Sequence, residues 1–191
     1  MRALLPLFAS ASLIAPVQAA WYLDAESSRL GFVATHDAGQ AGNQRFLVLH
    51  GSVDEQGQAT LRIEMDSVSS GTPLLDERLS ELLFDTRRYP EAQVQTRLDL
   101  GPILGLADGA QLEMRLPLRL TLREVTRTYH ADLLVTRLDA RRFQAVTLSP
   151  LLLDAVDLGL APGLEQLRTL AGLRDIGPSV PVGAVLIFAQ R

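Results

Sequence analysis

Strict alternation of apolar and polar residues over 112–122 is the feature that most constrains the fold of this chain. Leucine or methionine occupies every even position, and charged, threonine or proline residues occupy the odd positions. This period of two predicts a β-strand with one buried and one solvated face. Because leucine is not a strong strand former, the prediction rests on the period rather than on residue preference.

Weaker alternation predicts further strands, separated by turn residues at 37–40 and 54–57. These strands are expected at 30–36, 44–53, 61–66, 92–100, 128–135, 143–149 and 180–189. About eight strands in hairpin order predict an all-β fold, either a sandwich or a single antiparallel barrel. The last strand is apolar on both faces, so we expect something to cover its outer side.

Two short helices interrupt the strands. Residues 73–84 carry leucines at helical spacing, with Thr72 as a candidate cap before Pro73, and 164–170 repeat the pattern before Gly172. Both are too short to be stable alone. We expect them to lie against the barrel or to close one end of it.

The N-terminus predicts export. Met1 and Arg2 precede an apolar run over 3–15, and Val17 and Ala19 place small residues at the −3 and −1 positions of a cleavage site. We therefore expect a secretory signal peptide at 1–19, cleaved near Ala19 or Ala20. The remainder, 20–191, is expected to be one periplasmic domain. The alternative is an uncleaved membrane anchor.

Composition excludes several chemistries. The net charge of −4 argues against nucleic acid as a partner, because such binding is driven by clustered positive charge. The chain has no cysteine, which excludes disulfides, thiolate nucleophiles and cysteine zinc sites. No nucleophile elbow, phosphate loop or dinucleotide fingerprint occurs. We expect no catalytic residues and no enzyme activity.

The histidines do not predict a metal site. If the first hairpin turns near Gln40 and Ala41, His36 and His50 lie roughly 13 Å apart along the strands, too far to share an ion. His130 falls on the solvated face by parity. We expect His36 to be a hydrogen-bonded polar residue at the inner rim, and we expect no bound metal.

Because alternate residues of a strand face the same side, the strand patterns predict an apolar barrel interior. Ala34, Gly51, Ala131 and Ala145 are small inward residues that can leave a cavity. The nominated ligand-binding residues are Leu30, Phe32, Leu61, Ile63, Met65, Leu116, Leu118, Leu120, Ala131 and Leu133.

Several stretches together resemble the YceI family of periplasmic, lipocalin-like proteins that bind polyisoprenoid lipids. The resemblance is carried by residues 21–32 with His36, by 46–51, by 67–90, by 118–126, and by 167–172 followed by 180–182. Ser27, Leu75 and Glu124 stand where histidine, arginine and glycine are usual. The resemblance implies a lipocalin-like barrel of about eight strands with two short helices.

Two functions of different classes follow. The resemblance implies a carrier that holds an isoprenoid lipid or a quinone tail, with transient contact to the inner membrane and no other cofactor. The alternative is a barrel with a filled core, acting as an interaction partner of a membrane electron-transfer protein or as an uncharacterised enzyme. A continuous apolar tunnel favours the first function, and isolated voids favour the second.

Overall fold

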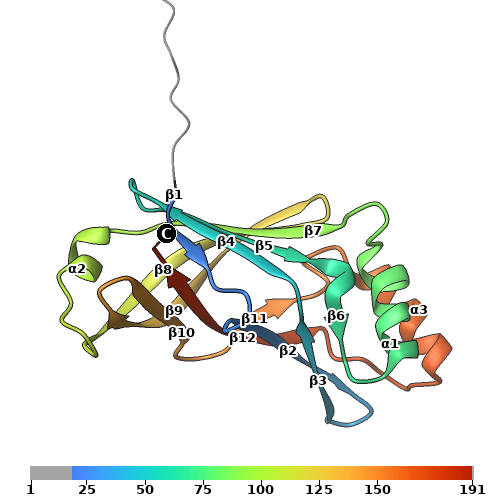
Figure 1. The fold of residues 1–191 in the computed structure, drawn as a ribbon. Coiled ribbons are helices and arrows are strands. Elements are labelled where there is room, and N and C mark those ends of the chain that lie inside the picture. Colours follow the sequence, from blue (N-terminus) through green and yellow to red (C-terminus); the bar gives the residue numbers. More distant parts are fainter. Residues whose placement is uncertain (1–18, 191) are drawn as a thin grey trace, which may run out of the picture.

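The last strand of the chain closes the sheet into a barrel (Figure 1). The computed structural model describes residues 19–190. One side of β12 (Ser179–Ala189) pairs with β1 (Ala19–Leu23) and β2 (Arg29–His36). Its other side pairs with β10 (Arg142–Thr147) and β11 (Leu151–Asp154). The predicted signal peptide lies outside the described residues apart from the backbone of Ala19.

The barrel wall is a meander of antiparallel strands. The remaining strands are β3 (Gln40–Phe46), β4 (Leu49–Asp54), β5 (Gln58–Glu64), β6 (Val68–Ser69), β7 (Glu91–Arg97), β8 (Gln111–Leu122) and β9 (Val125–Asp139). In four pairs of consecutive segments (β1 with β2, β3 with β4, β5 with β6, β10 with β11), both members take the same place in the order of strands around the barrel. The result is the predicted closed eight-stranded antiparallel barrel.

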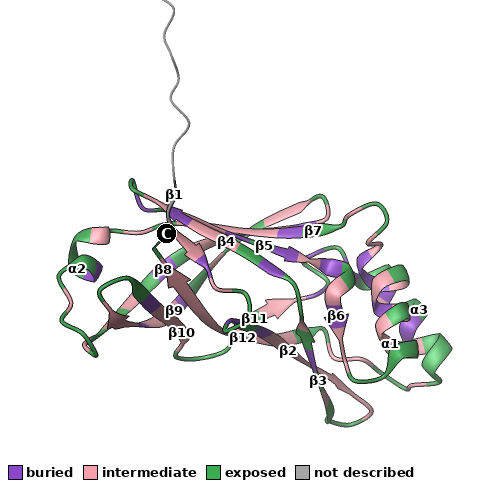
Figure 2. Ribbon diagram, in the orientation of Figure 1, coloured by how far each residue is buried: buried purple, intermediate pink, exposed green. Residues whose placement is uncertain are grey.

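The alternating stretch forms the central hairpin as predicted. Strand β8 pairs with β9 along its whole length, and Leu116 lies opposite Ala131. Leu116 and Ala131 are buried, whereas Arg115 and His130 on the other face are exposed. Figure 2 shows the same distribution, with buried positions spaced along the strands and exposed residues gathered in turns and on outer faces.

The first hairpin differs from its predicted register. Asp37, Ala38 and Gly39 form the turn with positive φ, so His36 pairs with Gln40 and Phe32 with Gln44. The strand predicted at 44–53 is also broken, because Leu47 and Val48 separate β3 from β4. The assumed turn near Gln40 and Ala41 was therefore wrong.

Helical segments lie at the two ends of the barrel (Figure 1). The predicted helices appear as α1 (Pro73–Arg78), continued by the π-helical η2 (Leu79–Phe84), and as α3 (Ala161–Ala171). A short 3-10 turn, η1 (Met65–Ser67), joins β5 to β6. Thr72 precedes α1, but its side chain makes no capping hydrogen bond. The sequence did not predict α2 (Leu100–Leu104), which lies at the opposite end.

The outer side of β12 is half-buried without a helix over it. Val185 and Ile187 alternate with the inward Ala184 and Leu186, and all four are half-buried. In the part of the chain that the structure describes, no helix lies over this face (Figure 1).

Helices η2 and α3 pack tightly against each other to form a cap, defined here as residues 79–84 and 161–171. Gly163 permits this approach, because a Cβ at this position would lie 2.5 Å from the carbonyl oxygen of Leu82 and 2.9 Å from Cα of Leu83. A backbone atom cannot move aside as the end of a side chain can. The close contact at Gly163 therefore fixes the position of α3 against η2 at this end of the barrel.

We expect Gly163→Val to lower the free energy of unfolding by about 1–3 kcal/mol, because the added side chain overpacks a backbone contact. Urea denaturation measures the change. The control is Gln166→Val on the exposed side of α3, where we expect only the helix-propensity cost of about 0.5 kcal/mol. Equal effects of the two substitutions would contradict the described packing.

Candidate functional site: an apolar cavity inside the barrel

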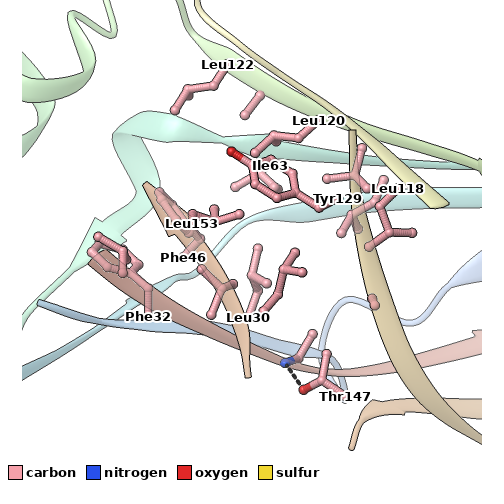
Figure 3. A pocket seen from close by; sticks show the side chains of 18 of the residues that line it. Leu30, Phe32, Phe46, Ile63, Leu118, Leu120, Leu122, Tyr129, Thr147 and Leu153 are labelled. Atoms are coloured by element: carbon pink, nitrogen blue, oxygen red, sulfur yellow. Dashed lines mark hydrogen bonds between the residues drawn. The ribbon is translucent and has the colours of Figure 1, made fainter. Parts of the chain in front are cut away.

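One cavity of about 590 Å³ occupies the interior of the barrel. Its lining extends from Trp21 and Ile103 at the α2 end to Leu75 and Leu164 at the cap end. Figure 3 shows side chains from several strands pointing toward a shared space, among them Leu30, Phe32, Leu118, Leu120 and Tyr129. A volume of roughly 300–1,000 Å³ is typical of a small-molecule site.

The interior stays unfilled because many inward side chains do not meet across it. No large side chain among the described residues is less than 2% exposed. Leu118, Leu133 and Leu186 face inward yet are only half-buried. Ala34, Ala131 and Ala145 line the cavity, as their small size predicts. Closely packed cores lack such space, because their side chains interdigitate.

All ten residues that strand parity nominates line this cavity. They are Leu30, Phe32, Leu61, Ile63, Met65, Leu116, Leu118, Leu120, Ala131 and Leu133. Their role in ligand binding stays a prediction. Gly51, nominated as a small inward residue, is not in the lining. A Cβ there would lie 3.1 Å from Cβ of Leu23 and 3.4 Å from the ring of Phe188, so neighbouring side chains fill the space.

Sequence reasoning missed the contribution of the last strand and of the cap. The inward face of β12 lines the cavity through Val180, Val182, Ala184, Leu186 and Phe188. Their alternation is a signal that parity would have found, although the outer residues between them are equally apolar. The cap adds Leu79, Leu83, Phe84, Leu164 and Leu167.

A small aromatic and aliphatic cluster closes the α2 end. Ile103 of α2 packs with Val135 and Phe143, and Trp21 meets the ring of Phe143 edge-on at 6.0 Å between centroids. Asp99 caps α2 by accepting a hydrogen bond from the backbone N–H of Gly101. These contacts place Trp21, the only tryptophan of the chain, in the cavity wall.

Two of the five hydroxyl groups in the wall, those of Thr147 and Thr96, bind backbone groups of the barrel. Thr147 Oγ1 accepts from the backbone N–H of Ala184 at 3.1 Å, the dashed bond in Figure 3. Thr96 Oγ1 donates to the carbonyl oxygen of Pro117 at 2.8 Å. Burial, followed by the nearby charge of Asp157, raises the pKa of the Tyr129 hydroxyl, which keeps it neutral.

Three polar residues form the wall near the cap end: His36 of β2, Gln44 of β3 and Arg78 of α1. Gln44 is 8% exposed, and its Oε1 has no hydrogen-bond partner among the described residues. His36 Nδ1 is also buried without a partner, with Asp37 Oδ2 at 3.8 Å. His36 therefore lies at the inner rim as expected, but the expectation that it is hydrogen-bonded was wrong.

The other two histidines lie outside the cavity. His50 is exposed and makes a 2.8 Å hydrogen bond with Glu64, and His130 is exposed on the outer face of β9. Across residues 19–190 the structure groups no three histidine, aspartate or glutamate side chains as a metal site would require. That the protein binds no metal stays a prediction.

A closed antiparallel barrel around a long apolar cavity defines the class of barrels that can enclose a slender hydrophobic ligand. A YceI-like domain model matches residues 21–185, and the chain belongs to the YceI family.

Solved structures resemble the chain over most of its length. A polyisoprenoid-binding domain from Saccharophagus degradans, implicated in plant cell wall breakdown, is 36% identical with a TM-score of 0.89, covering 91% of this chain and 100% of that one. BcnA from Burkholderia cenocepacia is 15% identical (TM-score 0.64, 86% and 98% covered). A CJ YCEI protein variant with a monobromobimane guest is 12% identical (TM-score 0.54, 82% and 89% covered). The last two share the fold alone.

No curated protein sequence matches the chain significantly. Within the described residues, none of the helices has the length and apolar character needed to cross a bilayer.

We expect Gln44→Leu to raise the free energy of unfolding of the ligand-free protein by about 1 kcal/mol, because it removes a buried acceptor that has no partner. Urea denaturation tests this. The control Gln95→Leu alters a half-buried glutamine of β7 outside the cavity lining and should change stability by less than about 0.5 kcal/mol. A loss of stability in Gln44→Leu would show that its amide has a partner.

Proposed function

We propose that this protein is a periplasmic carrier that holds a long apolar isoprenoid chain, such as a polyprenyl lipid or a quinone tail, inside its barrel. The observation that carries the proposal is the cavity of about 590 Å³, which is continuous and almost wholly apolar. The polyisoprenoid-binding relative supports the ligand class.

The energetics suit a chain-shaped ligand. Each buried methylene contributes about 0.8 kcal/mol, so a few isoprene units can offset the costs of association and ordering. Leucine, alanine and phenylalanine side chains offer the ligand no strong polar contact. Binding strength should therefore depend mainly on how much of the chain enters the barrel.

Binding is favoured over the two alternatives. A filled core predicts isolated voids, whereas the lining here is continuous from Trp21 to Leu164. An enzyme needs a reactive group aimed at its ligand, whereas the wall is almost wholly apolar and the hydroxyls of Thr96 and Thr147 are bound to backbone groups.

The location and the membrane contact are part of the proposal. The apolar run at 3–15 and the small residues at Val17 and Ala19 support export and cleavage. A carrier in the periplasm would acquire and release its ligand by transient contact with the inner membrane. N-terminal sequencing of exported protein should find a chain that begins at Ala20 or Trp21, and an intact Met1 in the membrane fraction would contradict the proposed processing.

The ligand itself can be identified directly. Exported protein, purified without detergent and extracted with organic solvent, should release an isoprenoid lipid in near-stoichiometric amount by mass spectrometry. Extraction of linear fatty acids alone would contradict the isoprenoid assignment.

We expect Ala131→Trp to abolish lipid retention while costing less than about 1 kcal/mol in stability. Ala131 lies in the middle of the cavity wall, opposite Leu116, and the new indole would occupy the space that the chain needs. In a packed core the same change would cost about 1–3 kcal/mol or more. Lipid content and urea denaturation are measured together.

The control is His130→Trp, one residue away on the exposed outer face of the same strand. It should keep both lipid and stability. If Ala131→Trp unfolds the protein, or retains its lipid unchanged, the cavity is not the binding site.

A further inference from the structure

Arg78 is the one permanently charged side chain in the cavity wall. No aspartate or glutamate among the described residues lines the cavity. Arg78 is half-buried at the end of α1, and it makes no hydrogen bond or ion pair with any residue of 19–190. An arginine beside an apolar space usually has a carboxylate partner, because an unpaired charge there is costly.

Gln44 gives a second, independent indication of a polar ligand group. Gln44 is 8% exposed and lines the cavity from β3, and its Oε1 makes no hydrogen bond with any described residue. Gly42 makes room for the amide, since a Cβ there would lie 2.8 Å from Gln44 Nε2. His36 lies on β2 two residues from Ala34, which pairs with Gly42. Its buried Nδ1 makes no hydrogen bond within the described chain, and the Asp37 carboxylate lies 3.8 Å away.

These residues lie where solvent reaches the cavity. Helix α1, which ends at Arg78, the β2–β3 hairpin and the segment after α3 all lie at the cap end of the barrel (Figure 1). Ala171, at the end of α3, is the exposed residue of the lining. His36 is 34% exposed in its side chain. The α2 end instead carries the closed cluster of Ile103 and Phe143.

We infer that the cap end is the entrance, and that Arg78, assisted by Gln44 and His36, binds an anionic head group on the lipid, of the phosphate class. The inference rests on the proposed function and deepens it. Arg78 donates hydrogen bonds, Gln44 can donate through Nε2, and His36 can donate from a protonated ring nitrogen. The unpartnered Oε1 of Gln44 can accept from the hydroxyl of a singly protonated phosphate, and an arginine fork matches phosphate geometry. A wall with one unpaired cation and no carboxylate favours an anion over a cationic or sugar head group.

Three matched probes distinguish the contribution of the head group to affinity from that of the isoprenoid chain. Delipidated exported protein is titrated with farnesol, farnesyl monophosphate and inorganic phosphate, followed by calorimetry and by Trp21 fluorescence. We expect farnesyl monophosphate to bind about tenfold more tightly than farnesol, the value of one charge-assisted contact. Inorganic phosphate alone should bind far more weakly than either lipid, because it gains nothing from the apolar cavity.

Arg78→Gln should remove this tenfold preference while leaving farnesol affinity within about twofold. Arg45→Gln is the matched control, because Arg45 lies on β3 beside Gln44 but is exposed and outside the lining. It removes the same charge and should retain the preference. In the unaltered protein the preference should fall with added salt, as expected for a charge contact that solvent reaches.

Equal affinity for the two lipids, or an unchanged preference in Arg78→Gln, would overturn the head-group assignment and leave the apolar carrier intact. Failure of both lipids to bind would overturn the carrier itself and this inference with it. Inorganic phosphate binding as tightly as farnesyl monophosphate would show a free-anion site and contradict a lipid head group.

Discussion

Closure of the sheet by β12 is the constraint on which the rest of the structure depends. Since β12 is paired on both sides, the barrel encloses its interior and leaves this strand no free edge. Eight strands set an interior width that large side chains can just fill. Here Ala34, Ala131 and Ala145 occupy inward positions, so the wall leaves space instead of meeting across it. The cavity therefore follows from closure combined with small residues.

The two ends of the barrel differ in chemistry, and this difference gives the cavity a direction. At the α2 end, Trp21 and Phe143 meet edge-on over a small apolar cluster. At the cap end, the wall carries its one permanently charged side chain among the described residues, Arg78, together with His36 and Gln44. A ligand with one charged end and one long apolar tail fits this arrangement in a single orientation. Transport of such a ligand needs the apolar tail shielded and the charged end near solvent.

Periodicity predicted the barrel and its lining well, because a period of two fixes the face on which each side chain lies. It did not predict β1, whose residues 19–23 are apolar without alternation, or α2, whose Gly101 and Pro102 are poor helix formers and whose position depends on tertiary packing of Ile103. The surroundings of His36 depended on the register of the first hairpin, which is set by positive φ angles at residues 37–39. Resemblance to a family supplied the ligand class, which strand patterns do not contain.

Fluorescence quenching of Trp21 by brominated lipids tests the central claim most directly, because this single tryptophan lies in the cavity wall at the closed end. An isoprenoid brominated at its tail end should quench Trp21 strongly on binding, whereas the same lipid brominated beside its head group should quench it weakly. That result would place the isoprenoid chain along the barrel, with its head group at the cap end. Equal quenching by the two lipids, or binding without quenching, would contradict a chain threaded through the cavity.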